Sequence, residues 1–272
     1  MDKIAIISDI HGNITALRAV LKDIEDRGIS KIYCLGDYVL KSCHSDLVID
    51  LVREKCDILL KGNCDSVITA PDIPKGRFWT RDLIGEERAA FLRNLPISYD
   101  FYMSGYLIRL FHASPFALDY IFNPMFSNKN TIYSGQEITN PMDMFKNTEF
   151  IGKSDNDSVP DIVGYGHIHT PNLVRIRNKT IFNPGSVGIP IEMLNDNYYD
   201  ETNKFSAVAS YMILEGILNE KKLSPINFNL IRLPYDVDRE VELLKNSNLP
   251  SKERLALELK SATNYSSMKS TL

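Results

Sequence analysis

The N-terminal third of the chain alternates short apolar runs with segments of helical periodicity, and this order constrains the fold most strongly. Residues 3–9 and 31–37 are nearly continuous apolar runs, which is typical of strands buried on both faces. Segments 13–27 and 45–55 carry apolar residues at helical spacing. A third apolar run, 57–63, completes a β-α-β-α-β order. This order predicts parallel strands joined by right-handed crossovers.

The remainder of the chain predicts further strands of mixed direction. Segments 97–103 and 106–113 are split by Ser104 and Gly105, which favours an antiparallel hairpin. Other strands are expected at 161–166, 173–183, 207–216 and 227–235, and helices at 81–94, 238–247 and 252–263. We therefore expect an α/β (α+β) protein with two stacked mixed sheets covered by helices, a four-layer arrangement.

Composition and organisation indicate a single folded domain over residues 1–272. The chain is 44% hydrophobic and 24% charged, as ordinary globular proteins are. It contains no internal repeat and no linker rich in proline, glycine or serine. The least regular segment, 116–160, is rich in asparagine and predicts an irregular insertion or a lid over a site.

Charge and cysteine usage exclude several classes of protein. The net charge of −4 arises from 31 basic and 35 acidic residues that are interspersed, so no dedicated nucleic-acid surface is predicted. The cysteines form no CxxC pair, which argues against a structural zinc site. There is no signal-peptide pattern and no apolar run of about 18 to 20 residues. We expect a cytoplasmic protein without a membrane partner.

Aspartate, asparagine and histidine recur where the expected strands end. These residues are Asp9, His11, Asp37, Asn63, His112, His167 and His169. In α/β sheets, groups at the carboxyl ends of parallel strands share one crevice. Taken singly, each is explained equally well as a turn residue, a helix cap or a buried histidine. Together they predict a metal site, and the i, i+2 spacing of His167 and His169 would direct both imidazoles to one face of a strand.

The number of candidate ligands fits two metal ions that share one carboxylate. One ion would be held by Asp9, His11, Asp37 and His169, and the other by Asp37, Asn63, His112 and His167. Two ions about 3.5–4 Å apart suit phosphate esters, because they bind substrate oxygens and lower the pKa of a bridging water. Mixed histidine, aspartate and asparagine ligands favour Mn, Fe, Zn, Co or Ni over Ca or Mg.

The ordered blocks SDIHGN, LGDYV, KGNCD, FHASP and GYGHIH resemble those of the calcineurin-like metallophosphoesterase superfamily. The resemblance spans residues 3–190, and FNPGSVGIP (182–190) is similar to a block of the small bacterial and archaeal phosphodiesterase branch. It implies an α-β-β-α sandwich, the ligands named above and two divalent or trivalent transition-metal ions, with Mn favoured. The implied activity is a phosphodiesterase in which a metal-bridging hydroxide attacks a small phosphate ester or nucleotide-like substrate. The implied catalytic residues are Asp37, Asn63, Cys64, Asp65 and His112.

Cys64 departs from the superfamily pattern. Many members carry a histidine there that contacts the phosphate, whereas a thiol with a pKa of about 8.5 suits that role poorly. Since the GNCD form resembles the phosphodiesterase branch, we interpret it as a variant active site. Cys64 is then either a small residue packed beneath the metals, a direct participant or a redox-sensing thiol. Asp65 is expected to orient a neighbour or to cap the turn that follows.

Other residues and other functions are weaker alternatives. Lys41 and His44 could reach a substrate phosphate, and Lys75, Arg77 and Trp79 could form a basic and aromatic rim. In the NPGSVG block, Gly185 and Gly188 would permit a tight turn, while Asn183 and Ser186 would support the ligands by hydrogen bonds. The alternative functions are a phosphomonoesterase or phosphoprotein phosphatase, a dinucleoside polyphosphate hydrolase, and a non-catalytic binding scaffold.

Overall fold

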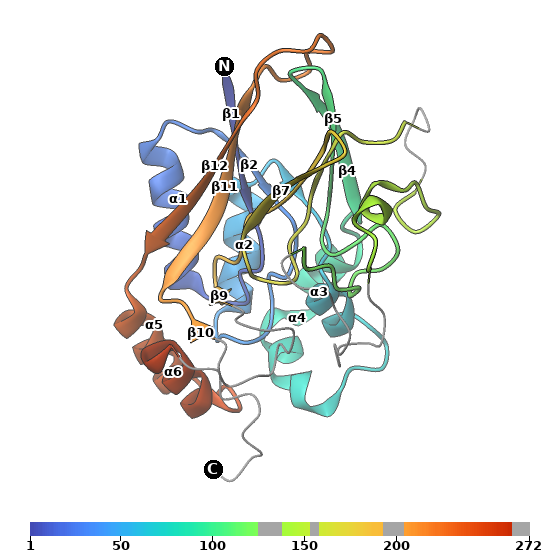
Figure 1. Cartoon of the computed structure of the whole chain (residues 1–272). Coiled ribbons are helices and arrows are strands. Elements are labelled where there is room, and N and C mark those ends of the chain that lie inside the picture. Colours follow the sequence, from blue (N-terminus) through green and yellow to red (C-terminus); the bar gives the residue numbers. More distant parts are fainter. Residues whose placement is uncertain (125–137, 153–157, 193–203, 263–272) are drawn as a thin grey trace.

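Two five-stranded mixed sheets stack face to face in the computed structural model, which describes residues 1–124, 138–152, 158–192 and 204–262 (Figure 1). The first sheet has the order β12-β11-β1-β2-β3, with β1 at Asp2–Ile7, β2 at Lys31–Cys34, β3 at Ile58–Leu59, β11 at Val208–Gly216 and β12 at Asn227–Pro234. The second has the order β4-β5-β6-β8-β7, with β4 at Ser98–Met103, β5 at Tyr106–Phe111, β6 at Ile162–Gly164, β7 at Asn172–Ile176 and β8 at Lys179–Asn183. A two-stranded sheet pairs β9 (Ile191–Glu192) with β10 (Lys204–Phe205). The predicted fold class is confirmed.

Parallel pairing brings several strand ends to one edge of each sheet. In the first sheet β1, β2 and β3 run parallel, as the β-α-β-α-β order predicts, and β11 is antiparallel to β1. In the second sheet β5, β6 and β8 run parallel. The crossovers of the first sheet are α1 (Ile14–Asp26) and α2 (Ser45–Lys55). Asn13 caps α1 by accepting a hydrogen bond from the Ala16 N–H at 2.9 Å.

The third strand is shorter than the run 57–63 predicts. Pairing stops at Leu59 because the chain must turn in towards Asp37: a Cβ atom on Gly62 would lie 2.1 Å from Asp37 Oδ1. Lys61 N–H therefore bonds the Pro96 carbonyl at 2.9 Å, outside the sheet. The next residues form a short helix that periodicity did not predict, α3 (Asn63–Ile68). Tertiary contact with Asp37, rather than local propensity, fixes this boundary.

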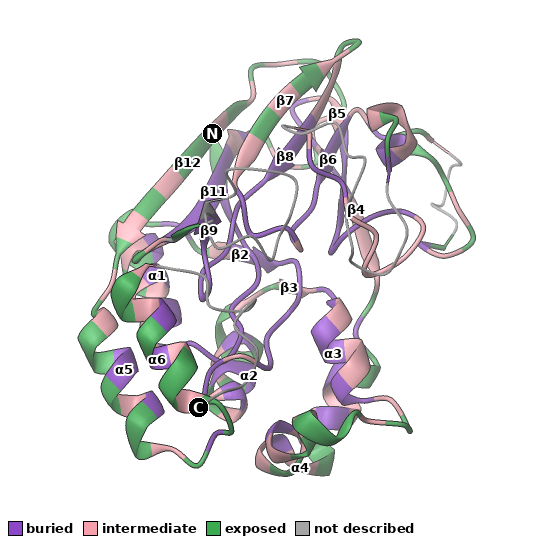
Figure 2. Cartoon of the chain, turned by 60° about the horizontal axis from the view of Figure 1, so that its bottom comes forward, coloured by how far each residue is buried: buried purple, intermediate pink, exposed green. Residues whose placement is uncertain are grey.

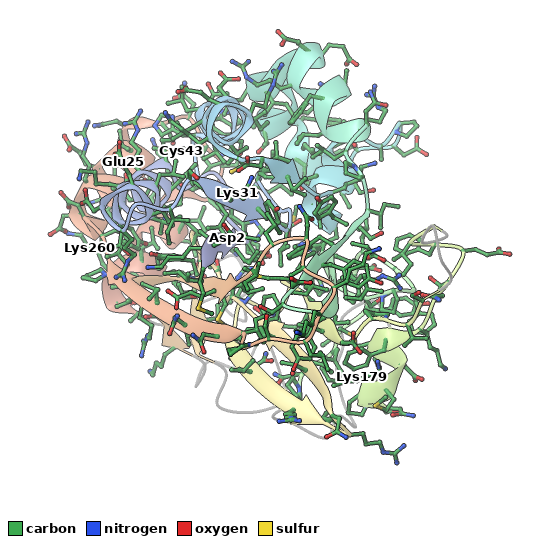
Figure 3. All side chains as sticks on the ribbon, turned by 90° about the horizontal axis from the view of Figure 1, so that it is seen from above. Asp2, Glu25, Lys31, Cys43, Lys179 and Lys260 are labelled. Carbon is green, nitrogen blue, oxygen red and sulfur yellow. The ribbon has the colours of Figure 1, made fainter. Side chains whose placement is uncertain are left out.

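Three apolar layers hold the sandwich together (Figure 2). On the outer face of the first sheet, α1, α2 and α4 (Phe78–Arg93) contribute Leu17, Val48 and Leu92 to one core. Between the sheets, buried residues such as Ile6, Met103 and Phe182 form a second core. Charged side chains of the outer helices, among them Glu25 and Lys260, point away from these layers (Figure 3).

The described part of segment 116–160 covers the outer face of the second sheet. Phe122, Met144 and Phe145 pack there with Val163 and Ile181. The helical element of this layer is a 3-10 helix, η2 (Pro141–Phe145). Residues 125–137 and 153–157 of the segment lie outside the described residues, and a lid role stays a prediction.

The C-terminal helix α5 (Val237–Asn246) docks beside α1, and α6 (Lys252–Ser261) packs on α5 (Figure 1). The contact buries Leu244 in an apolar cluster with Cys43, and it also contains a polar group. The fully buried Glu240 carboxylate accepts hydrogen bonds from Thr15 Oγ1 at 2.6 Å and from Ser42 Oγ. The loop after β2 is thereby tied to a helix more than a hundred residues away in sequence. In the described parts of the chain, no helix is long and apolar enough to cross a membrane.

Candidate metal centre

The predicted ligands meet where the parallel strands of the two sheets end. Asp9, His11, Asp37 and His112 are buried, while Asn63 and His167 are partly exposed. Their side-chain donor atoms separate into two groups. We name them the His11 set, with Asp9, His11, His169 and Asp37 Oδ2, and the His112 set, with Asn63, His112, His167 and Asp37 Oδ1.

The His11 set gathers two imidazoles and two carboxylates around one point. The Nε2 atoms of His11 and His169 are 3.0 Å apart. Asp9 Oδ1 lies 3.3 Å from His169 Nε2 and 3.9 Å from His11 Nε2. Asp37 Oδ2 lies 3.6 Å from His11 Nε2. Four donor atoms from three different loops therefore converge.

The His112 set is built around the amide oxygen of Asn63. This oxygen lies 2.9 Å from His112 Nε2 and 3.1 Å from His167 Nδ1. The other oxygen of Asp37, Oδ1, lies 3.5 Å from His112 Nε2. One carboxylate thus presents one oxygen to each set, which is the arrangement that a bridging ligand requires.

Backbone carbonyls fix the tautomer of three of these histidines. Nδ1–H of His11 donates to the Val39 carbonyl at 3.0 Å, that of His112 to Leu35 at 3.0 Å, and that of His169 to Ile189 at 2.7 Å. A carbonyl oxygen can only accept, so the proton must sit on Nδ1. In the neutral form of each ring the Nε2 lone pair therefore faces the centre, as ligation by imidazole requires.

The acceptor atoms of the His11 set have no donor among themselves, and a bound cation would satisfy them. The Nε2 atoms of His11 and His169 are both acceptors at 3.0 Å, and neither can donate to the other in its neutral form. Burial lowers the pKa of His11 well below its usual value, so protonation of His11 does not resolve the contact. Asp9 Oδ1 is buried and accepts no hydrogen bond. A metal ion would satisfy all three atoms.

The electrostatics of the second set also suit metal binding. Burial, followed by the charge of His112, lowers the pKa of His167 from 6.5 to about 3, which keeps this imidazole neutral. For His112, burial acts in the opposite direction but the carboxylates of Asp37, Asp9 and Asp65 outweigh it and raise the pKa. Binding of a metal ion at His112 would displace the proton that these carboxylates retain.

Several ligands occupy the left-handed backbone region, which side-chain-bearing residues seldom adopt. The φ angles are +55° at Asp9, +52° at His11, +59° at Asp37, +67° at His167 and +60° at His169. Aspartate and histidine tolerate this region better than most residues do, but each still bears strain. Since β6 ends at Gly164, the two histidines of GHIH lie in a loop and not in a strand. The expectation that they share one strand face was wrong, because both lie beyond the strand; each nevertheless faces the set to which the sequence assigned it.

Asp65 orients the loop that carries Asp37. Its carboxylate accepts hydrogen bonds from the N–H groups of Asp37 at 2.8 Å, Tyr38 at 3.0 Å and Gly62 at 2.9 Å. Burial raises the pKa of Asp65 to about 7, and the charge of Asp37 is the second cause. A cation on Asp37 would cancel that second cause. The bonds to Asp37 and Tyr38 are those of the orienting role, and the bond from Gly62 N–H, the N-cap residue of α3, is a capping contact.

Cys64 lies against the centre, with Sγ within 4.8 Å of ligand atoms of His11 and Asp37. Its backbone N–H donates to Asp37 Oδ1 at 2.8 Å. Burial, followed by the charge of Asp37, raises the pKa of the thiol well above its usual value. The side chain is only 8% exposed. In the metal-free chain these features describe a neutral thiol, which is unsuited to nucleophilic attack or to redox sensing.

The NPGSVG block supports the ligand loops in the predicted ways. Asn183 Nδ2 donates to the Gly166 carbonyl at 2.7 Å, and Ser186 Oγ donates to the Asp9 carbonyl at 2.7 Å. Gly185 adopts a φ of +77°, and a Cβ atom on Gly188 would lie 1.8 Å from the Ile10 carbonyl oxygen. Both glycines are therefore required by the backbone.

The sequence pattern did not indicate one supporting residue, Ser8. Ser8 Oγ donates to Asp9 Oδ2 at 2.6 Å, which directs the other oxygen of Asp9 into the His11 set. The only signal in the sequence is a serine immediately before a strand-end aspartate. Of the weaker candidates, Trp79 packs partly buried against Cys43, Leu244 and Leu249 and is not a free aromatic rim.

Comparison with known proteins assigns the chain to a family. Residues 2–199 match the calcineurin-like phosphoesterase superfamily domain. The uncharacterized protein MJ0912 of Methanocaldococcus jannaschii is 29% identical over 259 residues, which cover 91% of this chain and 93% of that protein.

Two solved structures share the fold over nearly their whole length. A metallophosphoesterase from Sphaerobacter thermophilus has a TM-score of 0.64 at 22% identity, covering 96% of this chain and 99% of that one. The hypothetical protein PH1004 from Pyrococcus horikoshii has a TM-score of 0.66 at 20% identity, covering 95% and 98%. With the domain match over most of its length, the chain belongs to the calcineurin-like phosphoesterase superfamily.

Proposed function

We propose that the protein is a dinuclear metal-dependent phosphodiesterase. Membership of the superfamily supports hydrolysis of phosphate esters, and the buried aspartates and histidines supply a site that could hold metal. The observation that carries the dinuclear proposal is Asp37, whose Oδ2 lies 3.6 Å from His11 Nε2 and whose Oδ1 lies 3.5 Å from His112 Nε2.

The residues of the chain hold and orient the centre in this proposal. Asp9, His11 and His169 would complete one site, and Asn63, His112 and His167 the other. Imidazole nitrogens together with carboxylate and amide oxygens favour Mn, Fe, Zn, Co or Ni, and Mn is the ion to test first. When bound, two such ions polarise phosphoryl oxygens and lower the pKa of a water between them.

A neutral thiol at Cys64 supports diesters over monoesters as substrates. A diester has two non-bridging oxygens and a single negative charge, whereas a monoester has three terminal oxygens and is largely a dianion at neutral pH. The Cys64 thiol is a weak hydrogen-bond donor and has no charge to offer a third oxygen. A small phosphodiester is therefore the proposed substrate, and a phosphomonoester or a dinucleoside polyphosphate is the rival.

Metal analysis combined with turnover of two aryl esters tests the proposal. The purified chain is assayed with bis(4-nitrophenyl) phosphate and with 4-nitrophenyl phosphate, with and without added Mn. We expect close to two ions per chain and a kcat/KM at least about tenfold higher for the diester, which is about 1.4 kcal/mol of discrimination. Preference for the monoester would show that the phosphodiesterase specificity is wrong, while hydrolysis of phosphate esters would still be supported. If the chain bound no metal and hydrolysed neither ester with any divalent ion, the remaining alternative would be a non-catalytic binding scaffold.

A further inference from the structure

Two residues of the loop after β2 hold His11 in place. The Val39 carbonyl accepts the Nδ1–H of the His11 ring at 3.0 Å, and Ser42 N–H donates to the His11 backbone carbonyl at 2.9 Å. Between these two residues, Leu40 and Lys41 adopt φ angles of +69° and +66°. A backbone strained in this way persists only where the surrounding structure over-determines it. A contact that fixes this loop therefore also fixes the His11 ring.

The Ser42 side chain ties this loop to helix α5. Its hydroxyl donates to Oε1 of Glu240, and both side chains are buried. The other carboxylate oxygen, Oε2, accepts hydrogen bonds from Thr15 Oγ1 at 2.6 Å and from Thr15 N–H at 3.4 Å, in the first turn of α1. One carboxylate thus joins the loop that holds His11 to the helix that follows His11 in the chain.

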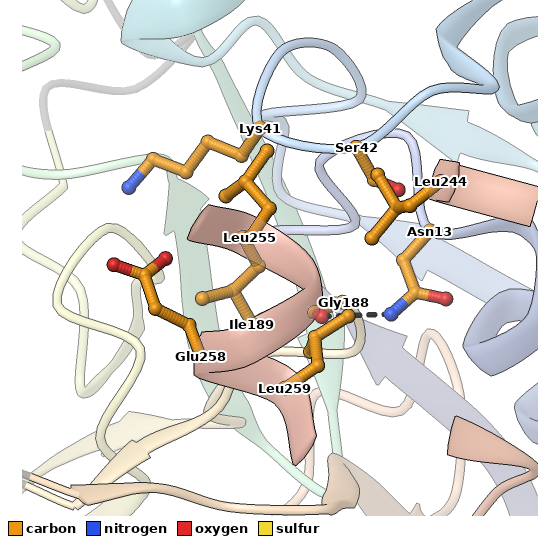
Figure 4. Close-up of a pocket in the computed structure, with 9 residues that line it drawn as sticks. All are labelled: Asn13, Lys41, Ser42, Gly188, Ile189, Leu244, Leu255, Glu258 and Leu259. Atoms are coloured by element: carbon orange, nitrogen blue, oxygen red, sulfur yellow. Dashed lines mark hydrogen bonds between the residues drawn. The ribbon is translucent and has the colours of Figure 1, made fainter. Parts of the chain in front are cut away.

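A small pocket lies where the C-terminal helices meet the loops that support the metal ligands (Figure 4). It is lined by Ser42 from the loop after β2, by Leu244 from α5 and by Leu255 from α6. Gly188 of the NPGSVG block also lines it, and the Gly188 carbonyl accepts a hydrogen bond from Asn13 Nδ2 at 2.9 Å. The C-terminal helices therefore lie directly against these loops.

The burial of a carboxylate at this contact calls for a role beyond packing. Removing a carboxylate from water is costly unless hydrogen bonds or positive charge stabilise it, and here Ser42, Thr15 and the positive end of the α1 dipole do so. Buried charged groups often add little net stability and can instead specify one arrangement of the chain. We propose that Glu240 is a positioning residue of the metal centre, which acts through Ser42 to hold His11 in the geometry that binds metal. The proposal rests on the proposed function, because it takes His11 as a metal ligand.

The test compares Ser42→Ala and Glu240→Met with Thr15→Ala in the full chain. Thr15→Ala is a matched control, because it removes a hydroxyl donor from the same carboxylate and leaves the bond to the loop intact. Mn affinity is measured by titration calorimetry, and hydrogen exchange in chelator follows the backbone amides of residues 38–44. We expect Ser42→Ala and Glu240→Met to weaken Mn binding at one of the two sites by about 10- to 100-fold and to speed the exchange of these amides. Thr15→Ala should bind Mn within about threefold of the original chain.

Two further variants test whether Glu240 acts through Ser42. Glu240→Gln should restore Mn affinity, because the amide oxygen can still accept the Ser42 hydroxyl. The double variant of Ser42→Ala and Glu240→Met should bind Mn no more weakly than Ser42→Ala alone, since both changes break the same hydrogen bond. A double variant weakened by the product of the two single losses would show that Glu240 does not act through Ser42.

The outcomes separate this proposal from the proposed function. If Ser42→Ala and Glu240→Met bind Mn as tightly as the original chain, Glu240 only docks the helices; the proposal is then wrong, while diester hydrolysis by the original chain would still support the phosphodiesterase. If Thr15→Ala weakens Mn binding as much as Ser42→Ala, the loss follows from looser docking and the proposal is overturned. If the expected losses occur but the original chain hydrolyses neither ester, the proposed function fails and Glu240 keeps its role. An original chain that binds no Mn would overturn both.

Discussion

Asp37 links more parts of the centre than any other side chain described above. Its two oxygens face different donor sets, its N–H is held by Asp65, and Oδ1 accepts the N–H of Cys64. The sequence predicted the ligand types at such positions, because an aspartate after a buried strand is a recognisable pattern. Tautomers and φ angles were not predictable, since they depend on carbonyls such as those of Val39 and Ile189 that are distant in sequence.

Replacing Asp37 by asparagine should uncouple the two sites. The amide keeps the shape but removes the negative charge that offsets repulsion between two cations. We expect kcat/KM to fall at least about 1,000-fold, about 4 kcal/mol of transition-state stabilisation, and Mn content to drop to one ion or fewer. Metal analysis and diester kinetics check this, with Asp26→Asn on the exposed face of α1 as the control. Full activity with two ions would show that Asp37 does not bridge.

Replacing Cys64 by serine should have a much smaller effect. Burial raises the pKa of the thiol, so it is neither a nucleophile nor a charged donor, and its backbone N–H bond to Asp37 is kept in the variant. We expect kcat/KM within about tenfold of the original chain. Iodoacetamide should label Cys64 only after unfolding, which peptide mass spectrometry can follow. A loss as large as that of Asp37→Asn, or fast labelling of the folded protein, would instead give the thiol a direct chemical role.

Among the secondary-structure elements, periodicity predicted those whose buried face is set by the spacing of apolar residues within the element itself. The strands β1 and β2 and the helices α1 and α2 fall where apolar spacing places them. The shortened β3 and the helix α3 did not, because their boundaries depend on contact between Gly62 and Asp37. No local pattern reports a contact of that kind.

Gly62→Ala tests that contact. The added methyl would lie 2.1 Å from Asp37 Oδ1 and 2.4 Å from Asp37 N, so the two loops must separate. We expect a loss of about 1–3 kcal/mol in the free energy of unfolding by urea and reduced Mn content. Gly76→Ala is the matched control, because a Cβ atom there meets nothing within 4 Å, and it should change stability by less than about 0.5 kcal/mol. Equal effects of the two substitutions would show that the close contact between Gly62 and Asp37 is not needed for the site.

For the molecule as a whole, the centre spans both sheets. Asp9, His11, Asp37 and Asn63 follow strands of the first sheet, whereas His112, His167 and His169 follow strands of the second. The stacking of two sheets was predictable from strand number and order. The outer layer of the second sheet was not, because it is made by the irregular residues around Phe122 and Phe145.

Metal loading should therefore stabilise the entire sandwich. An ion that binds only the folded chain adds RT ln(1 + [L]/Kd), about 2.7 kcal/mol at a hundredfold excess over Kd. We expect the unfolding midpoint to rise with Mn and to return to its starting value after chelation. Differential scanning calorimetry measures the shift, and Asp37→Asn should show a smaller one. A midpoint that is independent of Mn would mean that the sheets do not share an ion.

The metal-free protein should lose stability as the pH falls from 6.5 towards 3. Burial lowers the pKa of His167 from 6.5 to about 3, so the unfolded chain binds a proton in this window that the folded chain does not. Stability conferred by the neutral imidazole is thus present above pH 6.5 and is lost on acidification. Urea unfolding at several pH values in chelator checks the sign. In His167→Gln the slope should be shallower across this window; an unchanged slope would contradict the assignment.

The backbone conformation that places five of the metal ligands also lowers the stability of the fold. These ligands, which all have positive φ angles, are Asp9, His11, Asp37, His167 and His169. Each such residue costs about 1–2 kcal/mol that glycine would not incur. In a chain that did not bind metal, replacing any of these ligands by glycine would lower the backbone strain energy at that position. Retention of side chains at all five positions is therefore a trade-off, in which folding free energy is surrendered to keep donor atoms in place.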